Sequence, residues 1–147
     1  YTLWHTLSLH DALPIFFIII WKKELKKRSN MALMRNRKAT KVARKRMKKA
    51  QLFMADNKQD AFYEEVSQAL WGYLSDKFSI PLANLSMDTV AETLKKREVK
   101  EETIDQFIDT LNNCEYARFA PGESKGAMEN IYHDGVRIIS TMEQELR

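Results

Sequence analysis

Residues 58–78 read KQDAFYEEVSQALWGYLSDKF, and this run sets the architecture of the chain. Its apolar side chains recur at steps of three and four residues, which is the spacing of one face of an α-helix. The charged and polar side chains lie mainly on the opposite side. The run therefore predicts an amphipathic helix with an inward face made of Phe62, Val66, Ala69, Leu70, Tyr73 and Leu74, and with Trp71 at its edge.

A second helix is predicted immediately before this one, over residues 31–55. Asp56-Asn57 separates the two and is a turn signal. Two helices joined by so short a turn are expected to pack as an antiparallel hairpin. The apolar positions of the first helix again recur at helical spacing and are Ala39, Val42, Ala43, Met47, Ala50, Phe53 and Met54.

Three further helices are predicted on the C-terminal side of the hairpin. Ser86 is expected to cap a short helix over residues 87–97. Longer helices are expected over residues 101–119 and 124–146, joined by a loop at Pro121-Gly122. No segment shows the alternation of a strand. The prediction is thus an all-α fold, a helical hairpin plus three further helices in a small bundle.

The inward faces of these three helices contain the single cysteine of the chain, Cys114. One cysteine cannot form an intrachain disulfide. With no cation or histidine beside it in sequence, Cys114 is expected to be a buried and unreactive thiol. The other inward residues are expected to be Val90, Ala91, Leu94, Ile104, Phe107, Ile108, Leu111, Met128, Ile131, Tyr132, Val136, Ile139 and Met142.

Six apolar residues, 16–21, run directly into a basic cluster at 22–28. This junction is typical of a membrane-spanning helix that leaves the bilayer on the cytoplasmic side, where Trp favours the headgroups and positive charges stay inside. A complete span needs about 20 apolar residues. Residues 16–21 are therefore expected to be the end of a truncated transmembrane helix. The expected membrane-interface residues are Trp21, Lys22, Lys23, Lys26, Lys27 and Arg28.

The first fifteen residues are unlike the rest of the chain. Residues 6–15, TLSLHDALPI, resemble the conceptual translation of a common short-read sequencing adapter. Residues 1–15 are therefore interpreted as an adapter-derived artefact and excluded from functional reasoning. A native signal peptide is the alternative. Against it, the basic residues follow the apolar stretch instead of preceding it, and no small-residue cleavage site follows.

Charge divides the remaining chain into two parts. Residues 22–49 carry 14 Lys and Arg and one acidic residue, and residues 50–147 carry 10 Lys and Arg against 18 Asp and Glu. The first part is expected to be a basic juxtamembrane segment that includes a helical stalk and the start of the first long helix. The second is expected to be an acidic helical cytoplasmic domain. Membrane lipids or an acidic partner suit the basic part, since each cation near an anionic leaflet contributes about 1 kcal/mol.

Nucleic-acid binding is the alternative use of so many cations. The acidic remainder would repel nucleic acid, and no known recognition motif is present, so this partner is not favoured. Enzymatic chemistry finds no support either. His5 and His10 fall in the excluded start, His133 has no paired ligand, and no glycine-rich phosphate loop exists. The domain is expected to be non-catalytic, without cofactor or metal.

Two short stretches are rich in aromatic residues, at 71–74 and 116–121. Trp, Tyr and Arg are enriched at the energetic centres of protein interfaces. A place in the core is the favoured interpretation for these side chains, above all for Trp71, and partner docking is the alternative. The candidate partner-docking residues are Trp71, Tyr116, Arg118 and Phe119.

Three separated blocks resemble the region that follows the membrane span in BatD proteins, the oxygen-tolerance or aerotolerance family. They are residues 34–46, residues 61–77 and residues 114–122. The resemblance implies a single-pass bacterial inner-membrane protein with a large β-rich periplasmic part and this domain in the cytoplasm. The present chain lacks the periplasmic region.

The resemblance further implies protein partners of two kinds, MoxR-type AAA ATPases and von Willebrand factor A-domain membrane proteins. It links the domain to oxygen and stress tolerance and provides no catalytic residues. The expected function is that of a non-catalytic scaffold or adaptor, and the alternative is a basic nucleic-acid-binding helical protein.

Overall fold

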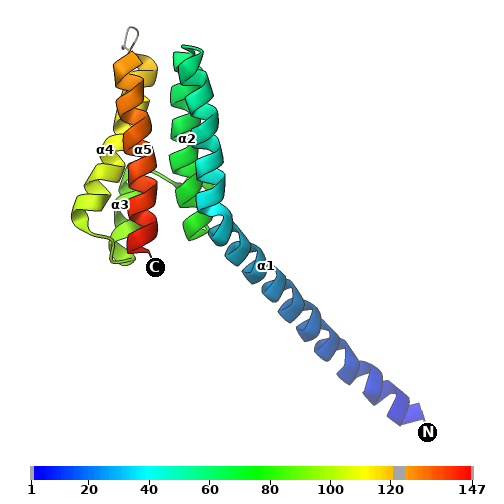
Figure 1. The fold of residues 1–147 in the computed structure, drawn as a ribbon. Coiled ribbons are helices and arrows are strands. Elements are labelled where there is room, and N and C mark those ends of the chain that lie inside the picture. Colours follow the sequence, from blue (N-terminus) through cyan, green and yellow to red (C-terminus); the bar gives the residue numbers. More distant parts are fainter. Residues whose placement is uncertain (1, 121–124, 147) are drawn as a thin grey trace. The chain divides into compact units, whose positions relative to one another are not determined.

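A computed structural model describes the backbone of residues 2–120 and 125–146 and the side chains of residues 13–120 and 126–146. In these ranges every regular element is a helix, which confirms the all-α prediction (Figure 1). The predicted loop at Pro121-Gly122 lies outside them. The elements are α1 (Thr2–Ala55), α2 (Gln59–Phe78), the 3₁₀ turn η1 (Leu82–Asn84), α3 (Met87–Lys96), α4 (Glu101–Phe119) and α5 (Lys125–Glu145).

The chain forms two compact units, residues 1–35 and residues 36–147, and α1 contributes to both. Residues 22–30 are helical, as expected of the stalk, and the helix continues without a break into the hairpin. Lys, Arg, Leu, Met and Ala dominate residues 22–55 of α1, and all of them favour helix. In the described part of the chain, no helix has an apolar stretch long enough to cross a membrane.

The predicted hairpin is confirmed inside the second unit, where residues 36–55 of α1 and the whole of α2 run antiparallel (Figure 1). Asn57 adopts a positive φ of 57° in the turn, a conformation that Asn tolerates better than most residues. The Lys58 N–H donates to the Phe53 carbonyl at 2.9 Å and closes this end. Near the other end, Asn36 Nδ2 donates to the Lys77 carbonyl at 2.8 Å.

The face of α1 that enters the core is narrower than predicted. Small side chains dominate this face, so the backbone of α1 packs close to the core. Val42, which the sequence places on the inward face, is 41% exposed. The inward prediction for Val42 is wrong because one residue turns the helix by about 100°, which carries Val42 off the stripe centred on Ala43. Val136 of α5, at 39% exposed, is a second error of the same kind. The buried stripe of α1 is Ala39, Ala43, Met47 and Ala50.

The other helices complete one hydrophobic core in the second unit. Ser86 caps α3 as predicted, and it exchanges hydrogen bonds with Thr89 in a capping box. Cys114 is 1% exposed, which confirms the buried thiol, and burial raises its pKa to about 12. The largest fully buried side chains are Tyr63, Tyr73, Phe62, Phe107, Leu70, Leu74, Leu94, Ile104, Leu111, Met128, Ile139 and Met142.

Two helical glycines predict unequal responses to alanine. A Cβ at Gly72 meets no atom within 4 Å, so Gly72→Ala should raise the unfolding free energy by about 0.5–1 kcal/mol. A Cβ at Gly135 would lie 2.9 Å from Met47 Cε, so this buried side chain would have to move. In urea denaturation, Gly135→Ala should therefore raise the unfolding free energy by less than Gly72→Ala does, or should lower it. An equal gain at both positions would contradict the packing described for Met47.

Candidate functional site

The first unit presents an apolar helical surface. Side chains at 16–21 point to every side of α1 and all are exposed, with Phe17 at 76% and Trp21 at 68%. A helix that is apolar all round is normally buried, either inside a protein or in a membrane. This stretch therefore has the character of a segment that is covered by lipid or by another protein.

The predicted interface cations follow this stretch directly. Lys22, Lys23, Lys26, Lys27 and Arg28 are all exposed, and none forms an ion pair with any residue whose side chain is described. Their charges are consequently available to an outside anion. The structure brings them within two helical turns of Trp21, as the sequence predicts.

In the second unit, α1 carries a separate group of cations, on the side away from its buried alanines. These side chains are spaced three and four residues apart, so they line one face of the helix. All are exposed, and they are Arg37, Lys38, Lys41, Arg44, Lys45 and Lys48.

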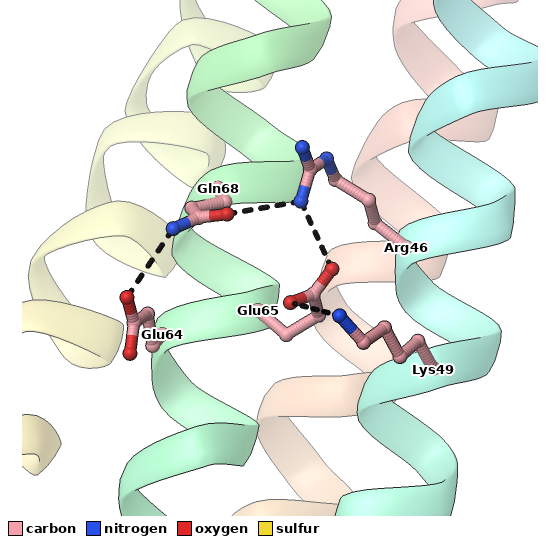
Figure 2. Close-up of polar contacts among 5 residues, drawn as sticks. All are labelled: Arg46, Lys49, Glu64, Glu65 and Gln68. Carbon is pink, nitrogen blue, oxygen red and sulfur yellow. Dashed lines mark hydrogen bonds and ion pairs between the residues drawn. The ribbon is translucent and has the colours of Figure 1, made fainter.

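A buried carboxylate joins α1 to α2. Glu65 is 6% exposed, and its two oxygens accept from Arg46 at 3.0 Å and from Lys49 at 3.5 Å (Figure 2). Arg46 also donates to Gln68 at 2.9 Å, and Gln68 in turn donates to Glu64 at 3.3 Å. A buried charge without such partners would be costly. The cluster therefore stabilises the hairpin.

The amphipathic pattern of α2 predicts that Glu65 lies on the outer face, but its side chain is buried. The pattern assigns charged side chains to the outer face, because it treats the helix alone. The signal that could have found its role is the pair Arg46 and Lys49, one turn apart on the neighbouring helix.

Two hollows flank this cluster and share Val42 and Arg46. The first has a volume of about 610 Å³ between α1, α2 and η1, and half-buried Trp71 lines it together with Gly72, Leu82 and Leu85. The second, of about 570 Å³, is lined by Lys45, Lys48, Lys49 and Leu52. Gln68, Ser75 and Asp76 also line the first hollow. The first hollow is thus partly apolar, and the second is mainly cationic.

The other three candidate docking residues lie at the C-terminal end of α4. Tyr116 is 72% exposed and Phe119 is 78% exposed, so neither is a core residue, and Arg118 is exposed beside them. Trp71 packs partly against the core, and none of these three lines its hollow. The candidate residues therefore belong to two surfaces.

The polar residues of the core are arranged for stability. In the described part of the chain, no group of three or more His, Cys, Asp or Glu side chains could hold a metal ion. His133 is exposed, and its ring contacts Tyr132 edge to face. Glu143 of α5 accepts from Tyr73 Oη at 2.7 Å and pairs with Lys77 Nζ at 2.9 Å, so it joins α5 to α2.

Glu143 gives the domain a predicted dependence on pH. Burial acts to raise its pKa, but hydrogen bonds from Thr40, Tyr73 and Lys77, with the charge of Lys77, lower the pKa below the ordinary 4.5. The stability that this carboxylate contributes is thus present above the unfolded value and is lost as pH falls through the folded value. Burial, with the same hydrogen bond, also holds the pKa of Tyr73 above its usual range.

Glu143→Gln should therefore lower the unfolding free energy at pH 7 by roughly 1–3 kcal/mol. The difference from the parent protein should shrink as the pH falls below the ordinary value of 4.5. Urea denaturation over a pH series measures this. Glu129→Gln, on the exposed side of the same helix, serves as the control. A difference for Glu143→Gln that stays constant with pH would contradict the lowered pKa.

Comparison of the chain with known protein families, with curated proteins and with solved structures found no match.

Proposed function

We propose that this chain is the cytoplasmic C-terminal domain of a single-pass bacterial inner-membrane protein of the BatD type. In this proposal residues 16–21 are the membrane-embedded end of its anchor, and the helical domain is a non-catalytic scaffold or adaptor linked to oxygen and stress tolerance. The observation that carries it is the exposed apolar surface at 16–21 beside five exposed cations at 22–28.

Both surfaces favour contact with a lipid bilayer. Burying one large apolar side chain contributes about 1.5–3 kcal/mol, so six exposed ones strongly favour a lipid environment. Cations next to an apolar stretch favour anionic headgroups and the cytoplasmic leaflet. The resemblance supports the family, and through the family it supports MoxR-type AAA ATPases and von Willebrand factor A-domain membrane proteins as partners.

Vesicle flotation of the full chain tests the anchor. The chain should float with vesicles that contain anionic lipid, and a high-salt wash should leave it bound, because salt screens charges but not apolar burial. Release by salt, together with retention on DNA, would instead favour a basic nucleic-acid-binding protein. The cations on the outer face of α1 are the observation that favours this second function.

A charge-neutralised variant tests the interface residues. Changing Lys22, Lys23, Lys26, Lys27 and Arg28 to Gln should weaken binding to anionic vesicles at low salt by roughly a thousandfold, at about 1 kcal/mol for each cation. The matched control removes the same charge from the second unit. It changes Lys38, Lys41, Arg44, Lys45 and Lys48 to Gln, and it should weaken binding far less. Equal losses would show that only total charge matters and would contradict a defined interface.

A further inference from the structure

The two hollows of the hairpin share Val42 and Arg46 and therefore adjoin each other. We propose that they form one groove, here called the hairpin groove, that binds an acidic amphipathic helix of a partner protein. The proposal rests on the adaptor role proposed above and is independent of the membrane anchor.

Exposed apolar side chains line the hairpin groove along its length. Leu82 is 58% exposed, Val42 is 41% exposed and Leu52 is 68% exposed, and the half-buried Trp71 lies in the same hollow as Leu82. Exposed apolar side chains are unfavourable in water, so the burial of this apolar surface would stabilise a complex with a partner that covers it. Trp is also the residue type most often found at the energetic centre of an interface.

The dimensions of the groove suit a helix. Val42 and Leu52 are ten residues apart on α1, which corresponds to about 15 Å along the helix axis. That length accommodates about three turns of a docked helix, enough for apolar anchors at positions i, i+4, i+7 and i+11. Gly72 adds space, because a Cβ there meets no atom within 4 Å.

The charge of the hairpin groove indicates which kind of partner helix would bind. Lys45, Lys48 and Lys49 line the second hollow, and all three are exposed. Glu65 is already paired with Arg46 and Lys49 (Figure 2). Asp76 lines the first hollow only, so the cations of the second hollow leave that end of the groove positive. A partner with carboxylates beside its apolar stripe matches this arrangement, since complementary potentials favour association and reject basic competitors.

A second copy of this chain fits the groove poorly. The exposed N-terminal half of α4 is acidic, at Glu101, Glu102, Asp105 and Asp109, but its apolar stripe is buried in its own core. The exposed apolar residues of the first unit lie next to the cations of 22–28, which the groove would repel. The occupant is therefore assigned to another protein.

The test uses the full chain in non-ionic detergent and a designed peptide. A fluorescein-labelled helix of about 18 residues carries Leu at positions i, i+4, i+7 and i+11 and Glu on its remaining face. Anisotropy should show saturable binding, at least about tenfold tighter than for a scrambled peptide of the same composition. Equal binding of the two peptides, or no binding at about 100 μM, overturns the proposal.

A variant at Gly72 locates the peptide. Gly72→Leu should fill the first hollow and weaken binding by about tenfold or more, whereas Asn112→Leu, on the exposed side of α4 and outside both hollows, should leave binding unchanged. Circular dichroism confirms that both variants are folded, and Leu82→Glu replaces Gly72→Leu if the latter is not. Equal affinity of Gly72→Leu and Asn112→Leu overturns the groove.

Charge variants separate specific from general attraction. Lys45→Glu with Lys48→Glu should weaken peptide binding, and the matched pair Lys95→Glu with Lys96→Glu at the end of α3 should not. Equal effects from the two pairs overturn the assignment. Gly72→Leu, which leaves the charge unchanged, is also tested for vesicle flotation, which should be unchanged. Peptide binding without flotation contradicts the anchor alone, and flotation without peptide binding contradicts the groove alone.

Discussion

Changing Phe17, Ile19 and Trp21 to Ser should release the chain from lipid vesicles. Each side chain is at least half exposed in the structure and contributes about 1.5–3 kcal/mol when it is buried in an apolar phase. Three together account for roughly 5–9 kcal/mol, so the partition coefficient should fall by at least about a thousandfold. Flotation in high salt measures this loss with the electrostatic contribution screened.

The control for this variant removes exposed apolar residues from the second unit. Tyr116, Phe119 and Val136 are also exposed, and changing them to Ser removes a comparable apolar surface. The proposed anchor predicts little change in flotation for this control. If both triple variants were released equally, general surface hydrophobicity would explain the binding, and residues 16–21 would have no special role.

Phe107→Ala should bring the helical domain close to unfolding. Phe107 of α4 is 0% exposed, and its ring is among the largest fully buried side chains of the core. Removing a buried Phe side chain costs about 3–5 kcal/mol, because the transfer energy is lost and a cavity remains. A domain of this size has only about 5–15 kcal/mol of stability in total.

Urea denaturation followed by circular dichroism measures the effect of Phe107→Ala. The matched control is Gln106→Ala, its neighbour on the exposed side of α4, which should change the unfolding free energy by less than about 0.5 kcal/mol. A cost below about 1 kcal/mol for Phe107→Ala would mean that the packing around this ring is not as described.

The sequence predicts the helices of this protein well because the signals are local. The Ser86 cap, the turn at Asp56-Asn57 and the start of α4 at Glu101 each depend on residues a few positions apart. The apolar spacing of α2 and α4 likewise identifies most of the buried side chains. Residues a few positions apart are sufficient to predict a helix where they alone decide the backbone conformation.

The surfaces were less predictable because they depend on what each helix meets. Val42 and Val136 satisfy the apolar period but lie beside the contact faces, where no neighbouring helix covers them. Glu65 breaks the period and is buried, because the opposing helix provides Arg46 and Lys49. Such pairings between helices are not encoded in the pattern of either helix by itself.

The buried Glu65 has a mechanical consequence for the hairpin. Sliding α1 along α2 by one turn in one direction would put Ala50 and Phe53 where Arg46 and Lys49 now lie, and neither can neutralise a carboxylate. Leaving that charge without a partner in the interior costs about 3–5 kcal/mol. Sliding in the other direction would put Val42 in the place of Arg46 and leave Lys45, in the place of Lys49, as the single cation beside Glu65. The ion pairs of Glu65 therefore favour the present register of the hairpin. A tension applied to residues 36–55 should be transmitted to the rest of the bundle without slippage between the two helices.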